Sequence, residues 1–245
     1  MKKFFVLTIP CALLLLAACK KKDSPAPTTG GGYAGVNSTT PHSGILVATR
    51  TSQYPLTPYP DTSYSANAYF YNTAQNGWNY YYPAYLSTIG SVSVNGIQLQ
   101  NSSNTYRDST GMIHFTDTAN WVVNGNPSIP SFSCSNAIFW PEYSGYGLIP
   151  DTVHIGQAFT LQLSGMTNTD SVQIYLASGS AFKQTNIFGA NTNFAVTAAM
   201  TASLPASNNA FVMVNMYKFL PVQSFSGKKF FFFYTYTFVK YIVVL

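Results

Sequence analysis

Apolar and polar residues alternate one by one in many short runs of this chain, and this period restricts the possible fold more than any other feature. The clearest run is Ser91–Gln100, in which Asn95-Gly96 separates two alternating segments. Asn-Gly supplies the positive φ angles of a type I′ turn, so the run predicts a β-hairpin whose apolar side chains share one face. That face would hold Val92, Val94, Ile97 and Leu99, and the opposite face Ser91, Ser93, Gln98 and Gln100.

Similar alternation recurs along the rest of the chain, and it predicts several more strands. These runs are Gly44–Arg50, Ala66–Tyr71, Met112–Thr116, Asn120–Val123, Phe159–Leu163, Val172–Leu176, Asn193–Thr197, Phe211–Tyr217 and Phe230–Val244. The only weak helical candidate is Phe194–Leu204. The apolar run that begins at Phe230 contains Thr235, Thr237 and Lys240, so we expect a long sandwich strand, buried on both faces at its start, rather than a membrane segment.

Short strands at this spacing, separated by turn signals, are typical of a sandwich or barrel. We therefore expect an all-β fold of the immunoglobulin-like sandwich type. A boundary near Pro150 would give two packed sandwich domains, and one continuous sandwich is the alternative. The expected organisation is a signal peptide at 1–18, an acylated cysteine and flexible tether at 19–43, an aromatic-rich β domain at 44–149 and an immunoglobulin-like sandwich at 150–245.

The first residues have the pattern of a secretory signal. Lys2 and Lys3 form a positive start, and Phe4–Leu16 is an apolar stretch of 13 residues. A membrane-spanning helix needs roughly 20 apolar residues, so this stretch is too short for an ordinary span.

The end of this segment, Leu16-Ala17-Ala18-Cys19, resembles the lipobox of bacterial lipoproteins. The resemblance implies that Cys19 receives a diacylglycerol on its sulfur, that the chain is cut before it, and that the freed amine is usually acylated. Two or more acyl chains give stable membrane attachment. With its lipobox, polar tether and aromatic-rich strands, the chain resembles envelope lipoproteins of the Bacteroidota, and those relatives bring no known activity.

This resemblance implies a lipid-anchored protein of the cell envelope, at the outer membrane, with its periplasmic or surface face left open. The surface-export signal of such lipoproteins is usually rich in acidic residues, whereas Lys20, Lys21 and Lys22 follow the cysteine here. These lysines suit anionic lipid head groups.

The charge of the chain argues against nucleic-acid binding. Of the 12 basic residues, five lie at positions 2, 3, 20, 21 and 22, which leaves seven in the body; of the seven acidic residues, only Asp23 precedes the body. A nearly neutral body lacks the basic stripe that neutralises phosphates. The partners that we expect are membrane lipid through Cys19 and either a glycan or another envelope protein.

Residues with catalytic chemistry are scarce in the body. It contains one glutamate and five aspartates, with no motif that marks a catalytic pair, no Gly-x-Ser-x-Gly and no His-Glu-x-x-His. The spacings of His114 with Asp117 and of Asp151 with His154 are weak metal signals, because residues three apart on a strand point to opposite faces. Cys134 has no charged neighbour in sequence, so we expect an inert thiol. We therefore expect no enzymatic activity, no cofactor and no metal.

Eleven aromatic residues lie between Tyr54 and Tyr85, a stretch without lysine or arginine from Thr51 onward. On a strand, Trp78, Tyr80 and Tyr82 would form a row on one face. Exposed, this row would be a platform for sugar rings or a protein partner; buried, it would be core. The sequence therefore predicts an envelope lipoprotein with a non-enzymatic binding or structural role, and the alternative is a carbohydrate-binding module that uses this row.

Overall fold

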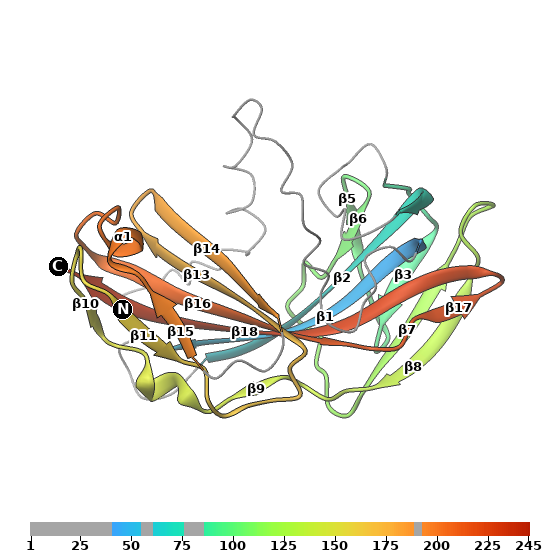
Figure 1. Ribbon diagram of the computed structural model, residues 1–245. Coiled ribbons are helices and arrows are strands. Elements are labelled where there is room, and N and C mark those ends of the chain that lie inside the picture. The colour runs from blue at the N-terminus through green and yellow to red at the C-terminus, as the bar shows by residue number, and fades with distance from the viewer. Residues whose placement is uncertain (1–40, 55–60, 76–85, 189–192) are drawn as a thin grey trace, which may run out of the picture. The chain divides into compact units, whose positions relative to one another are not determined.

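The computed structural model of the protein describes residues 41–54, 61–75, 86–188 and 193–245. Within these ranges the secondary structure is almost entirely β-strand, arranged in packed sheets (Figure 1). The prediction of an all-β sandwich is confirmed, while the immunoglobulin-like type stays a prediction. In the same ranges, no helix is both long enough and apolar enough to cross a membrane.

In the described part of the chain, ten strands form one large sheet. Eight of them follow the order β14-β13-β16-β18-β1-β2-β6-β5, and β10 and β17 also pair with β18. β18 runs parallel to β1 and β10, and the other pairs are antiparallel. The strands are β1 (His42–Tyr54), β2 (Asp61–Gln75), β5 (Gln100–Ser102), β6 (Thr105–Arg107), β10 (Thr152–Val153), β13 (Ser171–Ser178), β14 (Ala181–Phe188), β16 (Ser207–Phe219), β17 (Gln223–Phe225) and β18 (Lys228–Val244).

Smaller sheets complete the described structure. One has the order β4-β3-β7-β8, and the others are the pairs β11–β15 and β9–β12. Their strands are β3 (Ser91–Val94), β4 (Ile97–Gln98), β7 (Thr118–Asn124), β8 (Phe132–Ala137), β9 (Glu142–Tyr143), β11 (Phe159–Gln162), β12 (Met166–Thr167) and β15 (Asn193–Val196). A 3₁₀ turn, η3 (Gly145–Leu148), and a short helix, α1 (Ala198–Thr201), are the helical elements of the described ranges.

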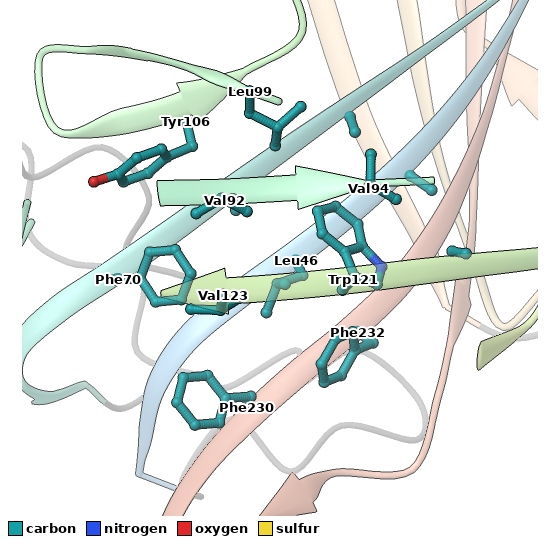
Figure 2. Close-up of a cluster of buried hydrophobic side chains, with 14 of the residues drawn as sticks. Leu46, Phe70, Val92, Val94, Leu99, Tyr106, Trp121, Val123, Phe230 and Phe232 are labelled. Carbon is teal, nitrogen blue, oxygen red and sulfur yellow. The ribbon is translucent and has the colours of Figure 1, made fainter. Parts of the chain in front are cut away.

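A first core cluster lies between the large sheet and the β4-β3-β7-β8 sheet (Figure 2). Alternate residues from part of β1, β2 and β18 contribute to it, including Leu46, Phe70 and Phe232. Val92 and Trp121 contribute from the facing strands β3 and β7. In β3 and β7 buried residues alternate with less buried ones, which matches the alternation in their sequences.

A second core cluster lies further along β18 and β16, against β11 and β15. Phe230 and Phe232 of β18 belong to the first cluster, whereas Phe238 and Ile242 of the same strand belong to the second. The large sheet also joins β1 and β2 to strands from beyond residue 150. The division into separate domains at 44–149 and 150–245 stays a prediction.

The hairpin at Ser91–Gln100 has the predicted turn and register. Asn95 and Gly96 have φ angles of 49° and 80°, and Val94 pairs with Ile97. Val92 and Val94 are fully buried and Leu99 is 2% exposed, whereas Gln98 on the opposite face is exposed. The prediction of this hairpin is confirmed for the turn and for the buried face, but the second strand, β4, ends at Gln98, and Gln100 pairs with Arg107 of β6 in the large sheet.

The start of β18 is buried on both faces, as predicted. Phe230 and Phe232 face the first core cluster, while Phe231 and Phe233 pack with Ile45 in a third cluster on the other face. Burial on both faces explains why this run is nearly continuous in apolar residues instead of alternating.

One local prediction was wrong, and a second holds only in part. Met112–Thr116 is not a strand, although Ile113 and Phe115 are buried in the first core cluster, so its alternation reflects packing without a ladder partner. Helix within Phe194–Leu204 is limited to α1, whose first turn is capped by the Thr197 side chain, and β15 takes the preceding residues.

Candidate functional site

The residues predicted to carry function lie outside the described ranges. Cys19 precedes residue 41, and Trp78, Tyr80 and Tyr82 fall between β2 and the isolated bridge at Leu86. The platform formed by these three aromatic residues therefore stays a prediction.

A pocket of about 480 Å³ lies where the chain crosses from the small sheet to the large one, between β4 and β5. Sites for small molecules typically have volumes of roughly 300–1,000 Å³. The lining residues are Gly90, Ser91, Gln98, Leu99, Gln100, Asn101 and Tyr106. Both β4 and β5 are terminal strands in the order of their sheets, so the pocket lies at an edge of the sandwich.

Two of the residues that line this pocket, Leu99 and Tyr106, are buried, and Figure 2 shows both among the side chains of the first core cluster. Leu99 is 2% exposed, and its backbone N–H donates to Val92 O at 2.8 Å, which holds the crossing segment against β3. Tyr106 is 1% exposed. Its hydroxyl donates to Ile89 O at 2.6 Å and accepts from Ile89 N at 2.8 Å, so the phenol is committed to the backbone.

The rim of the pocket depends on a close backbone contact. A Cβ atom on Gly90 would lie 2.7 Å from the carbonyl oxygen of Asn124, closer than real Cβ contacts. Glycine is therefore required where β3 begins beside the end of β7. Next to it, the Asn124 side-chain amide donates to Ser91 Oγ at 2.7 Å.

Three amide side chains line the pocket. Gln98, Gln100 and Asn101 are exposed. In the part of the chain that the structure describes, their side-chain amides make no hydrogen bond to protein. Each amide offers two N–H donors and one carbonyl acceptor, so the pocket can bind groups that both donate and accept.

A second polar feature, which we call the seam cluster, lies between the first and second core clusters. Its central residue is Arg50 of β1, which lies opposite Tyr64 of β2 and Tyr236 of β18. The Nε atom of Arg50 is buried without a hydrogen-bond acceptor. Around Tyr64 lie the rings of His114, at a centroid distance of 5.3 Å, and Trp140, at 5.9 Å.

Sequence reasoning identified neither the pocket nor the seam cluster. The amides of Gln98 and Gln100 were predicted on the solvent face of the hairpin, and only the clustering of Gln98, Gln100 and Asn101 in sequence hints at a site. For Arg50 the sequence holds no signal, because its ring partner lies at position 236.

Cys134 lies on β8 and is half-buried. Burial raises the pKa of its thiol to about 11, although the hydrogen bond from Asn136 acts in the opposite direction. A thiol with this pKa is protonated at neutral pH and is a poor nucleophile, in agreement with the inert thiol expected from the sequence.

Several acidic side chains have structural partners. Asp170 accepts from the Lys218 ammonium at 2.9 Å and from the backbone N–H of Phe219 at 2.8 Å. Asp151 pairs with Lys240 at 2.8 Å. In the described ranges, no group of three or more His, Cys, Asp or Glu side chains is arranged to hold a metal ion.

Comparison with protein-family models gives no match, and neither does comparison with curated proteins.

Proposed function

We propose that this protein is a lipid-anchored protein of the cell envelope, attached through acylated Cys19, that acts by binding or as a structural component rather than by catalysis. The observation that carries the proposal is the order Leu16-Ala17-Ala18-Cys19 directly after the apolar stretch Phe4–Leu16. A branched apolar residue, two small residues and a cysteine form the pattern of a lipobox at the expected distance from the positive start.

The arrangement of the mature chain suits such an anchor. Residues 24–43 are rich in Ser, Pro, Thr and Gly, a composition typical of a flexible tether. The first strand, β1, begins at His42, so the sheet starts where the tether ends. In this proposal the sandwich is held off the outer membrane by that tether.

Several reactive or charged side chains of the described residues have structural surroundings that account for them. The Cys134 thiol has a raised pKa, and Asp170 and Asp151 form ion pairs with lysines. These groups thus have structural explanations that do not require catalysis.

Metabolic labelling with an alkyne-bearing fatty acid tests the anchor. Wild-type protein expressed in a Bacteroidota host should be labelled and should sediment with membranes, and Cys19→Ser should abolish both. Cys134→Ser is the matched control, because it removes a cysteine from the sandwich and should leave the label intact. A wild-type product without label, or an equal label on Cys19→Ser, would rule out the proposal.

A carbohydrate-binding module is the alternative form of the binding role, based on Trp78, Tyr80 and Tyr82. It is favoured by the high density of aromatic residues between Tyr54 and Tyr85 without lysine or arginine. Pull-down on insoluble polysaccharides with wild type and with Trp78→Ala/Tyr80→Ala tests this alternative. Loss of binding by a folded variant supports it, and absence of binding by wild type excludes it.

A further inference from the structure

The pocket between β4 and β5 is an open hollow lined in part by polar groups that make no hydrogen bond within the described part of the fold. Its rim carries the amides of Gln98, Gln100 and Asn101, which make no hydrogen bond to protein within the described ranges. From this arrangement we infer that the pocket binds a neutral carbohydrate, held through its hydroxyl groups. The inference deepens the proposed binding role and rests on it.

The hydrogen-bonding capacity of the pocket matches hydroxyl groups. A sugar hydroxyl donates one hydrogen bond and accepts others, and a primary amide does the same from adjacent atoms. Two neighbouring hydroxyls on a ring can therefore pair with the N–H and the carbonyl of one glutamine. Gln98 and Gln100 precede and follow Leu99 in sequence, and both line the pocket, so both amides can contribute to binding one ring.

The lining of the pocket excludes a strongly charged ligand as the preferred occupant. None of its lining residues carries a charged side chain. The hydroxyl of Tyr106 is already bonded to both backbone groups of Ile89 and is not free to serve as a donor to an anion. An acidic sugar would lose hydration without gaining a cation in the pocket, which is unfavourable.

An extended peptide is the less suitable occupant. Peptides that add to a sheet edge gain specificity from pockets that accept alternate side chains. Here the apolar lining residues Leu99 and Tyr106 are 2% and 1% exposed, so they present almost no apolar surface to a peptide side chain. The exposed side chains of the lining include three amides, which favours the sugar.

The test uses the full-length, lipid-modified protein in detergent micelles. The probes are cellohexaose, xylohexaose, mannohexaose and maltohexaose, with hexagalacturonate as the charged comparison and a strand-forming peptide of alternating threonine and valine as the peptide comparison. Wild type should bind at least one neutral oligosaccharide by calorimetry. Its affinity should not change between about 50 and 500 mM salt, because screening acts only on charges.

Gln98→Ala/Gln100→Ala should weaken that binding by about tenfold or more, since it removes several hydrogen bonds from the ligand. The matched control is Gln184→Ala, an exposed glutamine on β14 that lies outside the pocket, and it should bind like wild type. Both variants should unfold at the wild-type temperature, because exposed amides contribute little to stability.

Three results would overturn the inference: no binding of any neutral oligosaccharide at millimolar concentration, unchanged affinity in Gln98→Ala/Gln100→Ala, or binding of hexagalacturonate or the peptide in preference to the neutral sugars. Loss of binding in Trp78→Ala/Tyr80→Ala with full binding in the glutamine variant would assign the ligand to the aromatic row instead. Fatty-acid labelling of Cys19 is measured separately. A negative result for sugar binding in the pocket is therefore distinguishable from a negative result for lipid attachment.

Discussion

The guanidinium carbon of Arg50 lies 4.8 Å from the ring centre of Tyr236, the residue directly opposite it across the parallel pair of β1 and β18. Tyr236 belongs to the second core cluster, while Tyr234, two residues earlier on the same strand, belongs to the first. A cation therefore occupies the seam between two apolar clusters of one sheet. The attraction between the guanidinium and the ring offsets part of the free-energy cost of burying the guanidinium.

Replacement of Arg50 by methionine should leave stability unchanged or raise it by about 1 kcal/mol. The variant keeps an apolar stem and removes an Nε–H donor that is buried without an acceptor, which costs roughly 1–3 kcal/mol, against a lost ring contact of about 0.5–1 kcal/mol. Urea denaturation measures the difference. Arg107→Met is the matched control, because Arg107 Nε is also buried without an acceptor. A loss above 1 kcal/mol in Arg50→Met alone would contradict this account of the seam cluster.

Gly96→Ala should destabilise the protein by roughly 1 kcal/mol through backbone strain alone. The φ angle of Gly96 is +80°, and an added Cβ would meet no atom within 4 Å. Gly147 in η3 has equally open surroundings without a positive φ angle, so Gly147→Ala serves as the control and should be neutral or slightly stabilising. Thermal unfolding compares the two variants, and equal losses would exclude the turn as the cause.

Gly90→Ala should lower the free energy of unfolding by about 1–3 kcal/mol relative to wild type. This loss should exceed that of Gly96→Ala. The new methyl group would press on the backbone carbonyl of Asn124, which cannot move without separating β3 from β7. Because Gly90 also lines the pocket, the same variant should weaken oligosaccharide binding. Urea denaturation and calorimetry on one preparation measure both effects, and a stability equal to that of wild type would show that the strands adjust freely.

Truncation of a buried side chain in the first core cluster should cost about 3–5 kcal/mol. Trp121→Ala is the suitable variant, since Trp121 is 2% exposed and packs between the sheets. Phe139→Ala is the control, because Phe139 is 57% exposed and should change stability by no more than about 0.5 kcal/mol. Comparable losses in the two variants, measured by urea denaturation, would mean that Phe139 is covered in solution.

Stability should fall in alkaline solution, in part through Cys134. Burial raises the pKa of this thiol from 9.0 to about 11 in the folded protein, so the unfolded chain ionises first. The contribution is fully present below about pH 9 and is lost as the pH rises towards 11. Urea midpoints of wild type and Cys134→Ala at pH 7, 9 and 11 measure it.

Wild type should lose more stability than Cys134→Ala above pH 9, and parallel curves would assign the whole decline to other groups. One such group is Tyr143, because burial raises the pKa of its phenol to about 12. Its contribution to stability is therefore lost at higher pH, between about 10 and 12. The onset of the decline therefore distinguishes the thiol from the phenol.

Local features were predictable from the sequence because their causes lie within a few residues. Asn95-Gly96 determines its own turn, and the alternation around it determines which side chains are buried. The double burial of Phe230–Phe233 was likewise readable from an unbroken apolar run. The segment around Ile113 alternates in the same way but pairs with no neighbouring strand, so the same reasoning predicted a strand that does not form.

Features that depend on pairing between distant segments could not be predicted. The seam cluster requires that residue 50 lie beside residue 236, and the pocket requires that the chain leave one sheet at Gln98 and enter another at Gln100. Periodicity specifies the face of a strand but not its neighbours. The amides of the pocket were therefore recognised as exposed but not as a group.

The position of β1 also has a consequence for the order of events during biogenesis. β1 lies between β2 and β18, and its parallel ladder with β18 joins residues 44–54 to residues 230–240. Such a long closure must wait until β18 has been synthesised. Until then one edge of β1 lacks its ladder partner and is open to mispairing with other strands.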